Sequence, residues 1–244
     1  MSLYDDLIKH KMLVQKYAKK QANELKKEMK VLQEMAEKQI RLYGYLNIKQ
    51  IAALRKAMEK NIEPIVKEQF KKLTQFYNYE AKFSAKVLKK DKKIKQALVV
   101  PEPKPKQIEK AQVAFTLNKP PVQLKKAYTQ FVQKKIDQTV QILRDAEVQK
   151  QDPLDSMRNL FLGLVAVQSF ILVGNAVNTT MNEARTDVIE ANSEELEIEQ
   201  VQWTAILDEA TCEDCEALDG EVFPYDDYPD CPYHANCRCE VVPI

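Results

Sequence analysis

The chain has 244 residues, with 45 % hydrophobic residues, only four glycines and a net charge of +1. Few glycines among many Lys, Gln, Glu, Leu and Ala favour long helices and argue against a turn-rich sheet protein. The N-terminus is acidic and then basic without an apolar core, which argues against a secretory signal. The number of cysteines, five, is odd, which argues against a complete disulfide framework. We therefore expect a mainly α protein made in a reducing cytoplasm.

Residues 1–98 predict a basic region of long amphipathic helices, arranged as a helical hairpin or bundle. Small and apolar side chains recur in the first helix at alternating spacings of four and three, the pattern of a coiled-coil seam. The seam is Ala18, Ala22, Leu25, Met29, Leu32 and Ala36. Gly44 is a stop signal for this helix, and His10 is expected on its solvated face. Helices are expected over 3–42, 47–61 and 64–90.

Residues 99–123 predict a Pro-rich connector. Pro101, Pro103 and Pro105 alternate with charged residues, and Pro120 and Pro121 follow. Proline removes a backbone donor and disfavours helix in the residue before it, so we expect an extended or irregular segment.

Residues 124–200 predict a second helical region. Within it, residues 159–182 carry no charged side chain, and this length would just suffice to cross a membrane. The stretch also contains polar residues, among them Gln168, Asn175 and Thr180. We therefore expect a helix buried in protein and no membrane partner.

Residues 201–244 predict a small β module stapled by metal, so that the fold is mainly α with a small C-terminal α+β part. Val201 and Trp203 alternate as in a strand, Asp219-Gly220 is a two-residue hairpin signal, and the segment after Cys237 is expected to be a short final strand. So small a module has little core of its own, and a bound metal would supply folding energy.

All five cysteines lie in this module, in a pattern typical of a zinc site. Four ligands in tetrahedral geometry close a structural site. We expect Cys212, Cys215, His234 and one of Cys237 or Cys239, while Cys231 is less well placed between prolines. Disulfides formed on exposure to air, or unligated thiols packed in the fold, remain alternatives. A catalytic zinc is disfavoured, because no Glu stands two residues after His234.

The order and spacing of these residues resemble the C-terminal signature of the phage Mu F-like minor head proteins. The signature reads W-T-x3-D-x2-T-C-x2-C-x2-L-D-G-x-V-F and then P-x-H-x2-C-R-C-x3-P, and EARTDV at 183–188 resembles the helix that precedes it in the family. The matching residues are Trp203, Thr204, Asp208, Thr211, Cys212, Cys215, Leu218, Asp219, Gly220, Val222, Phe223, Pro232, His234, Cys237, Arg238, Cys239 and Pro243.

The resemblance implies a structural minor capsid or head morphogenesis protein of a tailed phage, without enzymatic activity. Such a protein would be made in the bacterial host cytoplasm and reside in the virion, in the capsid interior or at the portal vertex. Its expected partners are the portal protein and other capsid proteins.

Charge adds a further expected partner. Residues 1–150 carry 34 Lys and Arg against 16 Asp and Glu, whereas residues 151–244 carry 3 against 20. The basic half suits packaged double-stranded DNA, although lysine-rich helices also carry such charge merely as a solvated face. Two alternatives remain: a nucleic-acid-binding zinc protein, and an ejected virion protein that acts on membranes through residues 159–182.

Overall fold

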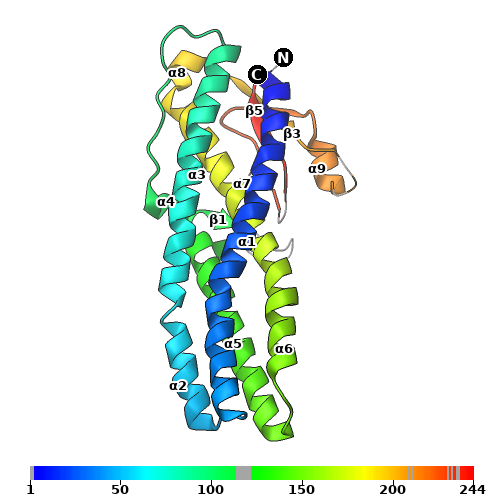
Figure 1. The fold of residues 1–244 in the computed structure, drawn as a ribbon. Coiled ribbons are helices and arrows are strands. Elements are labelled where there is room, and N and C mark those ends of the chain that lie inside the picture. Colours follow the sequence, from blue (N-terminus) through cyan, green and yellow to red (C-terminus); the bar gives the residue numbers. More distant parts are fainter. Residues whose placement is uncertain are drawn as a thin grey trace.

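The structure is a computed structural model, and it describes residues 3–113, 122–207, 209, 211–229, 231, 233–234 and 237–244. It is 71 % helical and forms an elongated bundle with a small sheet at one end (Figure 1). Helix α1 begins and strand β5 ends at that same end of the bundle. The expected fold class, long helices with a small C-terminal α+β module, is confirmed.

Helix α1 (Leu3–Tyr43) runs the length of the bundle as one continuous helix. Its seam side chains are all buried, and those of Leu25, Met29 and Leu32 are fully so. The helix ends at Gly44, whose φ is +68° and whose N–H donates to the carbonyl of Ile40. A left-handed residue of this kind satisfies the last carbonyls of a helix, and glycine adopts it without strain.

Helices α2 (Ile48–Glu59) and α3 (Ile62–Asp91) return along α1, as the sequence predicts. Asn47 caps α2: its side chain accepts from the Gln50 N–H, and the Gln50 side chain accepts from the Asn47 N–H. This reciprocal pair satisfies two otherwise free donors at the helix start.

The connector contains more regular structure than its prolines suggest. Helix α4 (Pro105–Lys110) starts with Pro105 in its first turn, where a missing N–H costs nothing. Strands β1 (Gln112–Val113) and β2 (Val122–Gln123) then pair antiparallel. The expectation of an extended or irregular segment was therefore wrong for residues 105–110, which are helical, whereas β1 and β2 are extended. Pro120 and Pro121 lie outside the described residues.

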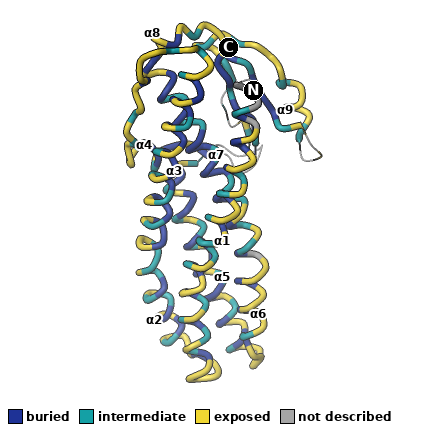
Figure 2. The backbone as a smooth tube through the Cα atoms, turned by 45° about the horizontal axis from the view of Figure 1, so that its top comes forward, coloured by how far each residue is buried: buried dark blue, intermediate teal, exposed yellow. Residues whose placement is uncertain are grey.

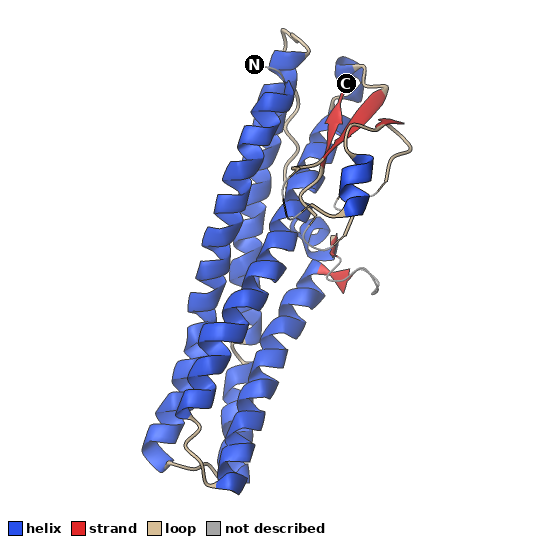
Figure 3. Ribbon diagram, turned by 90° about the vertical axis from the view of Figure 1, so that its right-hand side faces the viewer, coloured by secondary structure: helices blue, strands red, loops and turns tan. Residues whose placement is uncertain are grey.

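The remaining helices complete the bundle. Helix α5 (Leu124–Gln149) descends to the end opposite the sheet, and a continuous helical run then ascends from it (Figure 1). That run consists of α6 (Leu154–Asn159), a π-helical turn (Leu160–Leu164) and α7 (Val165–Ala191), and the short α8 (Ser193–Leu196) follows. Because α5 spans only part of the bundle, the C-terminal module fills the adjoining space beside α1 and α7 (Figure 3).

Helix α7 carries most of the uncharged stretch and packs against α1 and α3. Its side chains at Val165, Ala176, Val177 and Met181 are fully buried. By length and composition the run Leu154–Ala191 is also able to cross a membrane, and 53 % of its most apolar stretch is buried in the bundle. Buried positions line the inner faces of the helices throughout (Figure 2).

The C-terminal module is a three-stranded antiparallel sheet with one short helix. The strands β3 (Gln200–Thr204), β4 (Val222–Pro224) and β5 (Glu240–Pro243) lie in the order β4-β3-β5. Along the chain, helix α9 (Glu213–Leu218) follows β3 and precedes β4. The hairpin prediction at Asp219-Gly220 was therefore wrong in detail: these residues end α9 and lead into β4, with Gly220 at a φ of +84°.

Candidate metal centre

The first cysteine pair sits at the start of α9. Cys212 is the N-cap of this helix, and its Sγ accepts a hydrogen bond from the Cys215 N–H at 3.4 Å. The C-x2-C spacing thus turns both sulfurs toward one point. The Nε2 atom of His234 lies 2.9 Å from the Sγ of Cys212 and 2.9 Å from the Sγ of Cys215. These three ligand atoms form one compact group.

A second group shares one member with the first. The Sγ atoms of Cys215, Cys237 and Cys239 lie within 4.8 Å of one another. The Sγ–Sγ distance between Cys215 and Cys237 is 3.9 Å. Tetrahedral zinc with Zn–S bonds of about 2.3 Å places two sulfurs roughly 3.8 Å apart, so this spacing is that of two ligands on one ion. It is much longer than a disulfide, and all five cysteines are free.

Burial and hydrogen bonding shift the pKa values of the thiols in different directions. Burial raises the pKa of Cys215 to about 12. Hydrogen bonds from the thiols of Cys231 and Cys239 lower the pKa of Cys237 far below its usual range. Burial also raises the pKa of Cys212, but hydrogen bonds from Cys215 and His234 outweigh it and leave that pKa lowered. Burial raises the pKa of Cys231, and a hydrogen bond with Cys237 together with burial raises the pKa of Cys239. Thiolate, the form of cysteine that binds metal, is therefore favoured at Cys212 and Cys237.

Trp203 forms the wall of the cluster on the sheet side. Its side chain is fully buried on β3 and packs with Cys215, Cys237 and Cys239 in a small core of their own. The apolar ring shields the sulfurs from water, which is typical of a structural metal site.

Cys231 lies closer to the cluster than its sequence context suggests. Its Sγ donates to the Cys239 carbonyl at 3.3 Å and accepts from Asn182 Nδ2 at 3.4 Å. From the same face of α7, Asn178 Nδ2 donates to the Cys237 carbonyl at 2.9 Å. These two amides, four residues apart on one helix, fasten the cysteine loop to the bundle.

A buried network of charged side chains adjoins the cluster. His10 Nε2 lies 2.7 Å from Glu80 Oε1, and Arg185 Nε lies 3.6 Å from the other oxygen of Glu80. Arg185 also forms an ion pair with Glu240 on β5, and Lys11 Nζ lies 4.0 Å from the same carboxylate. The network therefore joins α1, α3, α7 and β5.

This network was not predicted from the sequence. The expectation that His10 sits on a solvated face was wrong: its side chain is buried and stacks on Phe83. Arg185 stands out in the sequence through its place in EARTDV, but its partners are not local. In the chain, 55 residues separate Arg185 from Glu240, and 70 separate His10 from Glu80.

The donor set fits a metal ion, which the side chains of these two groups can hold. Sulfur and imidazole donors together prefer soft or borderline ions, and zinc is the common choice for tetrahedral sites of this composition.

Residues 164–242 match the family model described as Phage Mu protein F like protein. This C-terminal part of the chain is Mu F-like. No curated protein and no solved structure matches the chain.

The Mu F-like region contains α7, the sheet, α9 and all six sulfur and imidazole donors. It also contains Arg185 and Glu240, whereas His10, Lys11 and Glu80 come from the part that the family model does not cover. Two residues of the predicted signature, Asp208 and Pro232, lie outside the described residues. The match indicates a phage head morphogenesis protein located in the virion and interacting with other capsid components.

Proposed function

We propose that the protein is a structural minor capsid component at the portal vertex or in the head interior, with no enzymatic role. The observation that carries this proposal is the Mu F-like match over the region that holds the cysteine cluster. That region packs into the helical bundle through buried contacts and does not form a separate appendage. A rigid body of this kind suits a protein that holds other proteins or DNA in place.

The proposed metal is a structural zinc, held by Cys212, Cys215, His234 and either Cys237 or Cys239. A structural zinc has all four positions filled by protein side chains, and this cluster offers sulfur and nitrogen donors in excess. When bound, the ion supplies folding energy to a module whose own core is small. The buried surroundings of Cys215, Cys237 and Cys239 support this role.

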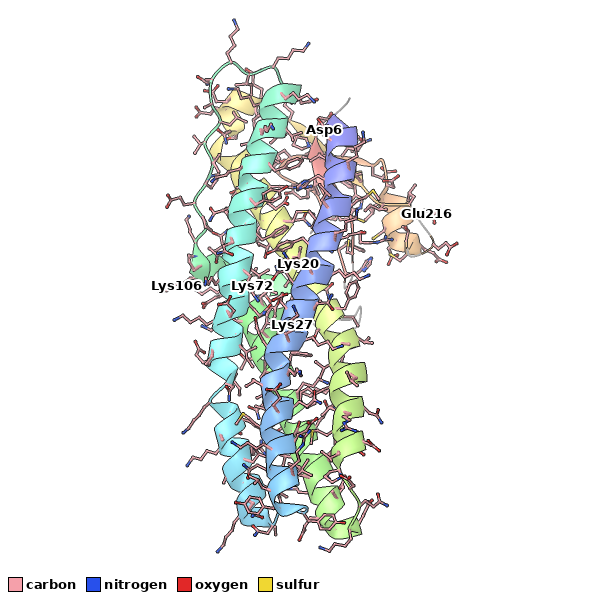
Figure 4. All side chains as sticks on the ribbon, viewed as in Figure 1. Asp6, Lys20, Lys27, Lys72, Lys106 and Glu216 are labelled. Carbon is pink, nitrogen blue, oxygen red and sulfur yellow. The ribbon has the colours of Figure 1, made fainter. Side chains whose placement is uncertain are left out.

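The bundle offers a basic face for packaged DNA. A groove of about 760 Å³ runs along α1 beside the π-helical turn. Its basic residues are Lys16, Lys19, Lys20, Lys26, Lys27 and Lys30. Figure 4 shows Lys20 and Lys27 along α1, and Glu216 on α9 at the acidic module. This arrangement supports DNA contact through the bundle and not through the sheet.

Purified particles test the structural role. In a phage that encodes this chain, we expect the protein in complete heads at low copy number, cross-linking to the portal protein or a neighbouring capsid protein. Deleting it is expected to reduce the yield of DNA-filled heads. The proposal is contradicted if heads assembled with portal contain none of the chain and deletion leaves particle yield unchanged.

Salt titration of DNA binding tests the basic face. The groove variant carries Lys16→Gln, Lys19→Gln and Lys20→Gln, and the control carries the same change at the exposed α3 residues Lys67, Lys82 and Lys86. We expect the groove variant alone to flatten the slope of log K against log salt by about 3, because each phosphate contact contributes roughly one. Equal effects of both variants, or no binding by the wild type, would remove DNA from the proposal without touching the capsid assignment.

A second candidate is a membrane-active protein that leaves the particle with the DNA. The observation that favours it is the run Leu154–Ala191, together with the exposed apolar side chains of Leu162, Val167 and Phe170. Flotation of the full chain with liposomes tests it, and recovery of all protein in the dense fraction would dismiss it.

A further inference from the structure

The cluster contains more metal donors than one zinc ion uses. One tetrahedral ion takes four ligands, and the module gathers five thiols and one imidazole. With Cys212, Cys215, His234 and Cys237 on the ion, Cys231 and Cys239 would remain as thiols beside it.

The donors fall into two groups that meet at one atom. Cys215 belongs to the group with Cys212 and His234 and equally to the group with Cys237 and Cys239. An ion in the first group and an ion in the second would therefore both contact the Cys215 sulfur. A thiolate sulfur has enough lone pairs to bridge two ions.

Cys231 lies next to the second group. Its thiol donates to the Cys239 carbonyl at 3.3 Å, and its Sγ accepts from Asn182 Nδ2 at 3.4 Å. A hydrogen bond donated to sulfur from a neighbouring helix is the usual outer contact of a metal-bound thiolate. Cys231 thus lies beside the second group of Cys215, Cys237 and Cys239 and would give it a fourth sulfur.

We propose that the cluster holds two zinc ions bridged by the thiolates of Cys215 and Cys237. Cys212 and His234 complete the first ion, and Cys231 and Cys239 complete the second. Two tetrahedral ions need eight ligand positions, and six side chains fill eight when two thiolates are shared. The two bridging sulfurs lie 3.9 Å apart, the spacing of two ligands on a common ion.

Lys11 adds a buried positive charge near the cysteine loop. Its side chain is 1 % exposed and comes from α1, outside the Mu F-like region. Its Nζ lies 4.0 Å from the carboxylate of Glu240, the residue that follows Cys239 in the chain. Five thiolates on two zinc ions would leave one net negative charge on the cluster, which a buried ammonium group nearby would help to offset.

Metal counting on the full chain tests the inference, which rests on the proposed zinc centre. Protein prepared with zinc under reducing conditions is measured by native mass spectrometry and elemental analysis. We expect two zinc ions per chain in the wild type and one in Cys231→Ser, which keeps the first ion. The fluorescence emission wavelength of Trp203, which is buried in the folded protein, checks that the variant is folded.

A cadmium-113 spectrum of the wild type requires no variant. We expect two resonances coupled to each other through the shared sulfurs. One zinc per chain, unchanged by Cys231→Ser, would overturn the second ion and leave the single structural zinc intact. No zinc at all would overturn both, and two uncoupled cadmium resonances would overturn the bridges.

Discussion

Arg185 on α7 and Glu240 on β5 form a buried ion pair that joins the helical bundle to the C-terminal sheet. Their side chains are 7 % and 0 % exposed. Burial raises the pKa of Glu240, but Arg185 and Lys11 outweigh this effect and hold that pKa below its usual value. The carboxylate is therefore charged in the folded protein, and the sheet is held by charges from two helices.

Removing one partner of this pair is expected to be costly. Arg185→Met leaves the buried carboxylates of Glu240 and Glu80 without their guanidinium, and a buried charge without its partner costs about 3–5 kcal/mol. Urea unfolding followed by circular dichroism measures the loss. The matched control is Arg158→Met, which opens an exposed pair with Asp155 and is expected to cost less than about 1 kcal/mol. Equal losses of unfolding free energy in both variants would show that the buried pair does not stabilise the contact between bundle and sheet.

Lys135 on α5 is expected to make the free energy of unfolding depend on pH in the alkaline range. Burial lowers its pKa from 10.5 to about 8, with the nearby charge of Lys134 acting in the same direction. Below pH 8 the folded state must bury a charged ammonium group, and between pH 8 and 10.5 folding releases a proton. The contribution of this residue to stability therefore rises with pH across that window.

Replacing Lys135 by Met is expected to remove this penalty. The variant should be more stable than the wild type by up to about 3 kcal/mol at pH 7, and the difference should shrink as pH approaches 10.5. Thermal unfolding at several pH values measures it. Lys134→Met, at an exposed neighbouring position, is the control and should change stability by less than about 0.5 kcal/mol. A pH-independent gain would mean that packing, and not titration, explains the effect.

Metal removal is expected to loosen the sheet module before the bundle. Trp203 is the chain's single tryptophan and packs against the cysteine cluster, whereas the bundle has a separate core. A strong chelator should therefore shift tryptophan emission to longer wavelength while most of the far-ultraviolet helical signal remains. Adding zinc back should reverse the shift. An unchanged emission spectrum in protein shown by elemental analysis to be metal-free would contradict the structural role of the ion.

The α1 seam is expected to carry much of the bundle's stability. Leu25 is fully buried, and Leu25→Ala should cost about 2–5 kcal/mol because it removes apolar contacts and leaves a cavity. Leu42 on the same helix is 62 % exposed, so Leu42→Ala should change stability by less than about 0.5 kcal/mol. Chemical denaturation compares the two. A small loss at Leu25 would indicate that the helix packs in another register.

Much of the fold was predictable because its signals are local. The spacing of Ala18, Leu25 and Leu32 follows the helical repeat, Gly44 ends α1, and the cysteine spacing brings donors to one turn. The division into regions ending at residues 98, 123 and 200 stays a prediction. The hairpin prediction failed because Asp219-Gly220 suits any tight turn, including the end of a short helix.

The sequence by itself determined the helices, the small cysteine-rich module and its Mu F-like character, because periodicity, capping and cysteine spacing are written in neighbouring residues. Only the tertiary structure decided what surrounds that module. It brought His10 to Glu80 and Arg185 to Glu240. It also placed Lys11 and Asn182 beside the cysteines. Such contacts depend on how α1, α3 and α7 cross in space, and a buried charge looks the same in the sequence as a solvated one.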